Sequence, residues 1–190
     1  MPAVVVPLFA IGVLVVVVGF LVVSTYNRFV ALRNRIAKAW SNIDVALKQR
    51  HDQLPNLVAA VRGLMAFERD VLEEVTAARS AYQPDASIPA QAATSEATSV
   101  AVRHLFAVVE NYPEVKSAAN VSALQAEIAR LEDIISDRRE LYNDSVFRYN
   151  TLLGQVPSNV IGALLGWRPE PFFKAEEVER ERPAVELSAG

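Results

Sequence analysis

The sequence predicts an all-α protein in which an N-terminal transmembrane helix continues into an antiparallel, coiled-coil-like bundle of about four long helices. Three observations carry this prediction. The first 23 residues contain no charged side chain. No glycine occurs from Leu64 through Leu153, where the turns of a β-rich fold would need several. Prolines divide the rest of the chain into segments of helical length, and they stand at positions 55, 84, 89, 113 and 157.

The membrane anchor is predicted from the run between Ala3 and Val23, which consists mainly of Val, Leu, Ile, Phe and Ala. As a helix rising about 1.5 Å per residue, this run spans roughly 30 Å, the thickness of one hydrocarbon core. We therefore assign residues 1–25 to a single transmembrane span. A cleaved signal peptide is disfavoured because nothing basic precedes the run and its weak cleavage site, at residues 10–12, lies mid-run. A buried core helix is disfavoured because soluble helices rarely extend this far without a polar residue.

The orientation is predicted from the charges that follow the span. Before residue 51 there is a single acid, Asp44, against the basic residues Arg28, Arg33, Arg35, Lys38, Lys48 and Arg50. The positive-inside tendency then places the C-terminal part in the cytoplasm, with an extracytoplasmic placement as the alternative. The same basic segment would face anionic lipid headgroups, so the lipid bilayer is the first expected partner.

The length of 190 residues leaves room for the anchor, one soluble domain over residues 26–168 and a mobile, charged tail over residues 169–190. The net charge is −3 and the acids and bases are interspersed, so no nucleic-acid partner is expected. The absence of cysteine excludes disulfides, thiolate metal sites, a cysteine nucleophile and a lipid-modified N-terminal cysteine.

The first two helices of the bundle are predicted on either side of residue 51. Apolar residues at three- and four-residue spacing extend the anchor helix through Tyr26 to about Arg50. A second helix then runs from about Asp52, which would cap it, to Tyr82, and Pro55 falls in its first turn. The sequence also allows one continuous helix with a kink at Pro55.

The third and fourth helices are separated by a turn around Pro113. The third extends from about residue 90 to residue 111. The fourth begins near Asn120 or Ser122, where Ser122 and Gln125 fit a capping box, and it runs to about Leu153. Its apolar stripe predicts coiled-coil-like packing and comprises Leu124, Ile128, Leu131, Ile135, Tyr142, Val146, Tyr149 and Leu153.

The segment from Val160 to Trp167 is apolar, and Phe172 and Phe173 follow it. Two interpretations stay open. The segment is a cap that closes the end of the bundle, or it lies in the membrane interface with Trp167, Phe172 and Phe173 at the headgroup level. From about residue 174 the chain has little to bury, so we expect a mobile tail there.

A family resemblance is carried by two segments, AWSNIDV at residues 39–45 and QRHDQLPNLV at residues 49–58. Both resemble the signature of the LemA family. Shorter matches follow in the same order over nearly the whole chain, at residues 78–80, 112–113, 124–127, 142–143, 149–150, 157–159 and 172–173. Two positions depart from the family pattern: Val156 stands where an aromatic residue is usual, and Leu131 stands where threonine is frequent.

The resemblance implies a bacterial single-pass protein of the inner membrane with a soluble helical bundle and no established enzymatic activity. It also implies a relation to membrane organisation, because a family of magnetosome-membrane proteins is similar, and genomic company with membrane proteases and TPM-domain proteins. Some relatives are exported lipoproteins, but this chain lacks their cysteine.

The polar cluster that most resembles a reactive site is Arg50, His51 and Asp52 beside Asn56. A zinc site needs three or four converging ligands, and the only other histidine is His104. We therefore interpret Asp52 as a helix cap and expect Arg50 and His51 to contact the bundle or lipid. We expect His104 to be a partly buried structural residue.

The carboxylates of the bundle are interpreted as solvated helix faces, because di-iron bundles need Glu-x-x-His pairs and the sequence has none. These carboxylates are Glu73, Glu74, Glu127, Glu132 and Asp133. The chain also has no Gly-x-Ser-x-Gly elbow and no glycine-rich phosphate loop. We therefore predict no catalytic, cofactor-binding or metal-binding residue, no small-molecule substrate and no enzymatic activity.

A candidate interaction or structural motif remains. It comprises Trp40, Asn42, Asp44, His51, Asp52, Pro55, Asn56, Tyr142, Asn143, Tyr149 and Asn150. Asparagine inside a helix is unfavourable unless its amide is satisfied, so these residues either fix helix register through hydrogen bonds or line a groove for a partner. The sequence as a whole predicts a membrane-anchored scaffold or adaptor that binds membrane proteins or associates with itself. The alternative is a membrane-shaping protein that oligomerises and inserts amphipathic segments into one leaflet.

Overall fold

The computed structural model describes residues 2–63 and 68–174, and these form six helices and no strand. The helices are α1 (Pro2–Arg62), α2 (Arg69–Ser80), α3 (Ile88–Val109), α4 (Pro113–Ser117), α5 (Ala119–Gly154) and α6 (Ser158–Leu164). The all-α prediction is therefore confirmed. The predicted mobile tail lies mostly outside the described residues.

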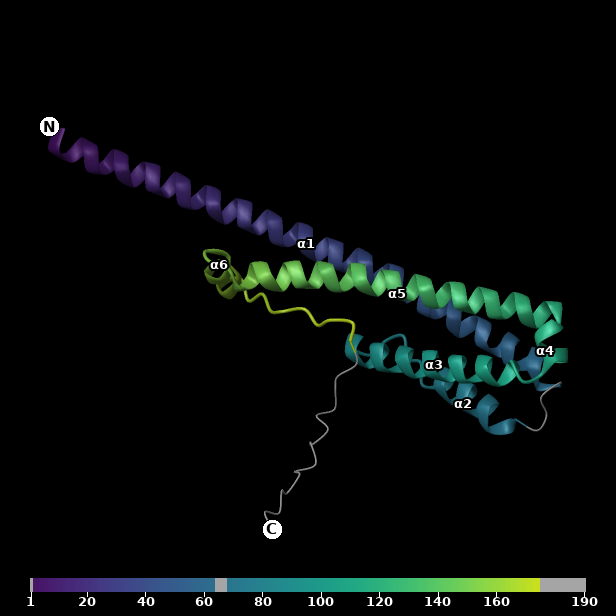
Figure 1. Ribbon diagram of the computed structural model, residues 1–190. Coiled ribbons are helices and arrows are strands. Elements are labelled where there is room, and N and C mark those ends of the chain that lie inside the picture. Colours follow the sequence, from purple (N-terminus) through teal and green to yellow (C-terminus); the bar gives the residue numbers. More distant parts are fainter. Residues whose placement is uncertain (1, 64–67, 175–190) are drawn as a thin grey trace, which may run out of the picture.

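Helix α1 is one continuous helix of 61 residues that runs from the N-terminal apolar stretch to the far end of the bundle (Figure 1). The expected helix end near Arg50 and the Asp52 cap are wrong, because both residues lie inside α1. The alternative of a continuous helix holds through Pro55 but only as far as Arg62, where α1 ends. Pro55 removes one helical hydrogen bond. The helix continues through it because Leu54 and Leu57, on either side of the proline, are both buried in the core.

The N-terminal part of α1 has the length and composition of a candidate membrane span. Its most apolar window has a mean hydropathy of 2.8, and none of that window is buried by the rest of the chain. In Figure 1 this stretch extends beyond the bundle with nothing packed against it. An apolar helix that no other part of the chain covers is more stable in the hydrocarbon core of a bilayer than in water.

The remaining helices are arranged around the second half of α1. Helix α5 packs antiparallel along α1, and α2 and α3 lie together beside the C-terminal half of α1 (Figure 1). The residues predicted for one helix over 52–82 are divided between α1 and α2, and α1 ends just before Gly63. The predicted turn at Pro113 is the short helix α4.

The predicted stripe of α5 forms its buried face. Ile128, Leu131, Ile135, Tyr142, Val146 and Tyr149 are buried, while Leu124 and Leu153 are partly buried. The capping box is wrong, because α5 begins at Ala119 and Ser122 lies inside it without capping the helix. At α3, by contrast, Ser87 is a true N-cap whose hydroxyl accepts a hydrogen bond from the amide of Ala90 at 3.4 Å.

The core consists of two apolar clusters stacked along α1. The proximal cluster, nearer the candidate membrane span, is rich in aromatic residues and includes Phe29, Ile36, Ile43, Ile135, Tyr142, Tyr149 and Phe173. The distal cluster is aliphatic and includes Leu54, Leu57, Val61, Val75, Leu105, Val109, Val115 and Ile128. A set of polar residues lies between the two clusters and is described below.

The C-terminal segment closes the proximal end of the bundle. Trp167 packs against α1, with ring centroids 5.8 Å from Tyr26 and 4.2 Å from Phe29. Phe173 is buried in the proximal cluster, whereas Phe172 is exposed. The contacts of Trp167 and Phe173 match the cap interpretation, and Phe173 is too deeply buried to lie in the membrane interface.

Candidate functional site

The polar residues between the two clusters are centred on Arg50 of α1, whose side chain is only 3% exposed. We call Arg50, Ser95, Ser99 and Glu132 the polar layer. Nη1 of Arg50 donates to the Ser99 hydroxyl at 2.9 Å and to Oε1 of Glu132 at 2.5 Å. Nη2 donates to the hydroxyl and the carbonyl of Ser95, at 2.9 and 3.2 Å. One guanidinium therefore connects α1, α3 and α5.

The polar layer satisfies a charge that would otherwise be very unfavourable inside the bundle. A buried arginine needs a paired carboxylate and further acceptors, since desolvation of an unpaired charge costs several kcal/mol. Ser99 completes the arrangement, because its hydroxyl also lies 2.6 Å from the second oxygen of Glu132. Glu132 is 27% exposed, so its carboxylate joins the buried layer to the solvent.

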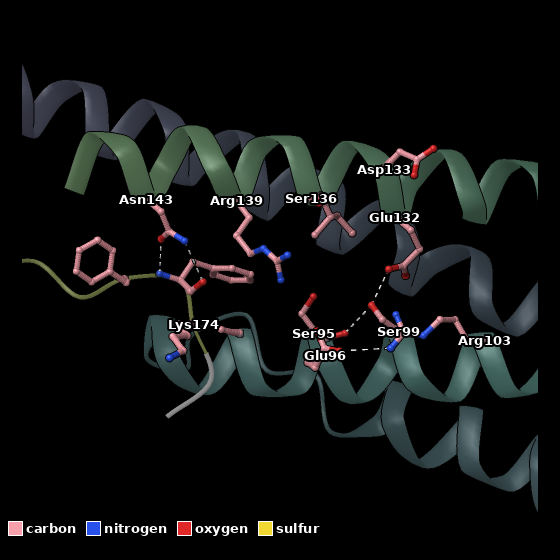
Figure 2. Close-up of a pocket in the computed structure, with 14 residues that line it drawn as sticks. Ser95, Glu96, Ser99, Arg103, Glu132, Asp133, Ser136, Arg139, Asn143 and Lys174 are labelled. Carbon is pink, nitrogen blue, oxygen red and sulfur yellow. Dashed lines mark hydrogen bonds and ion pairs between the residues drawn. The ribbon is translucent and has the colours of Figure 1, made fainter. Parts of the chain in front are cut away.

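A groove of about 670 Å³ opens above the polar layer, between α3 and α5. Figure 2 shows Ser95 and Ser99 on its α3 side and Glu132 and Arg139 on its α5 side. The full lining is Ala92, Ser95, Glu96, Ser99, Arg103, Glu132, Asp133, Ile135, Ser136, Arg139, Asn143, Phe172, Phe173 and Lys174. Ten of the fourteen lining residues are polar or charged, and both signs of charge are present.

Two arginines on opposite walls of the groove differ in their surroundings. Arg103 of α3 pairs with Glu96 on the same helix at 3.4 Å. Arg139 of α5 extends into the space between the helices (Figure 2), and in the described part of the chain it makes no ion pair. A guanidinium that has no ion-pair partner in the described part of the chain can bind a carboxylate or a carbonyl from another molecule.

One end of the groove is formed by an irregular segment, residues 169–173, which we call the strap. Asn150 holds the strap through paired hydrogen bonds of 2.9 Å with the amide and carbonyl of Glu170. Asn143 likewise accepts from the amide of Phe173 at 2.8 Å and donates to its carbonyl at 3.4 Å. The expected tail boundary at residue 169 therefore falls inside a segment that is fixed to α5.

The proximal half of the candidate motif converges on this strap. Trp40 contacts the rings of Tyr142 and Phe173, at 5.8 and 5.9 Å. The Tyr142 hydroxyl donates to the carbonyl of Pro171 at 2.9 Å. Burial, with a smaller effect of the Glu170 charge, raises the pKa of Tyr142 to about 12. Tyr149 is also buried and packs edge-on against Phe29 at 5.6 Å.

The other members of the candidate motif lie along α1 and do not converge on one site. Asn42 is exposed, and its carbonyl accepts a hydrogen bond from Arg138 at 2.5 Å. Asn56 is also exposed and donates to Gln53 at 3.2 Å, one turn earlier in the same helix. These two asparagines therefore face solvent on the outside of the bundle.

Asp44, His51 and Asp52 lie near Tyr82, two residues beyond the end of α2. The His51 ring lies 5.0 Å from that of Tyr82, and its Nδ1 atom is 3.3 Å from Asp52. The pKa of Tyr82 is raised by burial and, to a lesser extent, by the charge and hydrogen bonding of Asp44. No group of three metal-ligating side chains occurs within residues 2–63 and 68–174.

Two further expectations for single residues are wrong. His104 is exposed instead of partly buried, and its ring pairs with Glu74 at 2.8 Å. Glu132 is not on a solvated face, because it is the partner of Arg50. The sequence contains one indication of the polar layer. Arg50 occupies a position in the stripe that runs from Leu47 to Leu54, where an apolar residue would be expected.

Comparison with known proteins identifies relatives along most of the chain. A sequence model of the LemA family matches residues 39–187. Protein LemA of Metamycoplasma hominis is 26% identical over 166 residues, which are 85% of this chain and 74% of that protein. Magnetosome protein MamQ 2 of Paramagnetospirillum magneticum is 33% identical over 84 residues, and MamQ of Magnetospirillum gryphiswaldense is 32% identical over 84 residues. Each of these matches covers 44% of this chain and only 29% of the magnetosome protein.

Proposed function

Because the chain belongs to the LemA family, we propose that it is a membrane-anchored adaptor that binds a segment of a partner protein in the groove between α3 and α5. The observation that supports this most directly is the groove itself. Its walls are two helices joined below by the buried Arg50 layer, and Arg139 extends into it. A site with a fixed floor and an available cation on one wall is suited to recognition.

The chemistry of the lining favours a polar peptide as the occupant. Hydroxyls, carboxylates and guanidinium groups line both walls, and Phe172 adds one exposed ring at the strap end. A segment with backbone carbonyls and at least one acidic side chain would satisfy Arg139, while its donors would face Glu132. We propose a membrane protein as the source of this segment, because the adaptor is itself held at the bilayer.

We propose that the protein binds its partner without catalysing a reaction, since LemA proteins and the MamQ relatives are not known as enzymes. The groove offers no obvious nucleophile and base. The hydroxyls of Ser95 and Ser99 are occupied by the Arg50 and Glu132 contacts. Activation of a serine would need an adjacent base that is free to accept its proton.

The adaptor idea is testable by crosslinking in intact membranes. A photoreactive residue at Ser136, in the groove, should give a defined adduct, whereas the same residue at Ala129, exposed on α5 outside the groove, should not. Adding Arg139→Glu should remove the adduct. The matched control Arg130→Glu, outside the groove, should retain it. Equal adducts at both positions, or no adduct at Ser136, would contradict the proposal.

The side of the membrane is part of the same proposal. We place the bundle in the cytoplasm because the basic residues gather just after the span, among them Arg28, Arg33 and Arg35. The chain has no cysteine, so a single Ala129→Cys variant can be labelled in whole cells with a thiol reagent that does not cross the inner membrane. Protection from the reagent supports the cytoplasmic placement, and labelling supports the extracytoplasmic one.

A membrane-shaping role is the second candidate, and it is favoured by the similarity to proteins named as magnetosome proteins. Full-length protein reconstituted into vesicles distinguishes the two roles. An adaptor should leave the vesicles spherical at any protein density, whereas a shaping protein should produce tubules or smaller vesicles as its density rises. Electron cryomicroscopy of the vesicles reads this outcome directly.

A further inference from the structure

An apolar surface remains uncovered at the end of the bundle that lies nearest the candidate membrane span. Helix α6 buries Ile161 and Gly162 towards the bundle. Its outer side and the residues flanking it are also apolar and stay exposed: Val156 and Leu164 are each 81% exposed, and Val160 and Leu165 are exposed as well. Because both sides of the helix carry apolar residues, exposure of its outer side to water is unfavourable.

The depth of this surface follows from the contacts of α6 with α1. Trp167, just after α6, packs on Tyr26 and Phe29, and Thr25 is already buried. At about 1.5 Å per residue, Tyr26 lies only about 5 Å along the helix from Val23, the last residue of the span. The headgroup layer is about 5–7 Å thick on each side of the hydrocarbon core. Helix α6 is therefore placed at the level of the headgroups. Figure 1 shows it at the proximal end of the bundle, beneath the part of α1 that follows the candidate span.

The charges around α6 match an anionic membrane surface. Neither residues 24–43 nor residues 145–169 contain an aspartate or glutamate. These two stretches form the proximal end of the bundle, and they carry Arg28, Arg33, Arg35, Lys38 and Arg168, together with Arg148, which pairs with Asp144. Acidic headgroups attract such a basic surface when it lies within a Debye length of them.

We propose that the outer side of α6, formed by Val156, Val160, Leu164 and Leu165, is a second membrane contact that inserts shallowly into the leaflet from which α1 emerges. Lipid is the occupant because the surface continues directly from the span and is surrounded by basic residues. The contact would fix the angle between the bundle and the bilayer. It requires neither oligomers nor curvature, and it is independent of what binds in the groove.

The absence of cysteine allows a direct test on the full chain. A nitroxide spin label is attached at Leu164→Cys, and the protein is reconstituted into vesicles of phosphatidylcholine with phosphatidylglycerol. The matched control is Leu141→Cys, an exposed leucine on the neighbouring helix α5. Residue 141 lies at the level of Trp40, because Trp40 packs on Tyr142, and that level is about 25 Å beyond Val23.

The measurement is the collision rate of each label with oxygen, which partitions into lipid, and with a water-soluble nickel chelate. We expect the oxygen-to-nickel ratio to be several-fold higher at position 164 than at position 141. The ratio at 164 should fall when phosphatidylglycerol is omitted. Equal ratios at the two positions would overturn the proposal, since α6 would then face water. Shielding of position 164 from both reagents would also overturn it, because a protein surface would then cover α6.

Discussion

The proximal and distal halves of the bundle close their cores by different means. In the distal half, α2, α3 and α4 join α1 and α5, and the aliphatic core is enclosed by helices on several sides. In the proximal half, most of the core lies between only two long helices, α1 and α5. Because α2, α3 and α4 do not enclose this half, large aromatic side chains, the strap and α6 cover its core instead.

This difference shows why the candidate motif is concentrated in the proximal half. A segment without regular structure exposes backbone groups that no helix or sheet satisfies, so side-chain amides must bind them. Asn143 and Asn150 do this for the strap. The strap in turn forms one end of the groove, and the polar layer at the junction of the two halves forms its floor.

Truncation of a side chain in the proximal core should have the largest effect on stability. Phe29→Ala removes a fully buried ring that packs on both Tyr149 and Trp167, so we expect a loss of about 4 kcal/mol in the free energy of unfolding. Leu105→Ala is the matched distal variant and should cost about 3 kcal/mol. Hydrogen exchange read by mass spectrometry should show lost protection in α6 and the strap for the first variant, and in α2 and α3 for the second. Identical exchange patterns would show that the halves are one cooperative unit.

The polar layer that separates the two clusters should be nearly as sensitive. Glu132→Ala leaves the Arg50 guanidinium buried without its carboxylate, and we expect a loss of about 3 kcal/mol in denaturant titrations. The matched control is Asp144→Ala, which breaks the exposed Arg148–Asp144 pair on the same helix and should leave the unfolding midpoint unchanged. A small effect of Glu132→Ala would mean that water or another group replaces the carboxylate.

Release of the strap tests whether the proximal half depends on its amide contacts. Asn150→Ala removes two backbone hydrogen bonds to Glu170, so stability should fall by about 2 kcal/mol, and residues 168–173 should become sensitive to protease. Asn42→Ala is the control, because the exposed Asn42 side chain makes no hydrogen bond with any described residue. If the strap remained resistant in Asn150→Ala, then the Phe173 anchor alone would be sufficient.

Alkaline pH should weaken the proximal half through Tyr142. Its pKa is about 12 in the fold because of burial, against an ordinary value of 10.0, so the unfolded chain ionises first. The contribution of Tyr142 is therefore complete below pH 10 and is lost as the pH rises towards 12. Tyr142→Phe should cost about 1 kcal/mol at neutral pH through the lost bond to Pro171. The variant should also show a shallower loss of stability above pH 10 than the parent protein, and parallel curves would contradict this assignment.

Much of the fold could be predicted from periodicity, because burial of an apolar face decides where a helix packs. The stripe of α5 from Ile128 to Tyr149 is the clearest case. The break predicted at Asp52 failed because a proline and an aspartate are local signals, and the burial of Leu54 and Leu57 outweighs them. Arg50 can be buried because it pairs with Glu132, although the two lie 82 residues apart in sequence. No local pattern in the sequence shows which of the many carboxylates will meet a given arginine.

The candidate site was less accessible to sequence reasoning. Asn143 and Asn150 could be singled out as amides that need partners, but their partners are backbone atoms of the strap, which has no periodicity. Ser95 and Ser99 resembled ordinary helix residues in a segment rich in alanine and threonine, and only the position of Arg50 makes them part of a site. The sequence can therefore point to an amide that needs a partner, but it does not show which backbone atoms that partner will be.

The smallest expected effect concerns the turn after α6. Gly166 has a φ of 68°, which a residue with a side chain adopts at a cost of about 1 kcal/mol. Alanine also lowers the entropy of the unfolded chain, so Gly166→Ala should destabilise by a net amount of about 0.5 kcal/mol. Gly154→Ala is the matched control, because Gly154 ends α5 with open space around it and alanine should stabilise the helix slightly. Opposite signs in thermal unfolding would show that the turn holding Trp167 over α1 requires a left-handed residue, whereas equal signs would show that the turn adjusts freely.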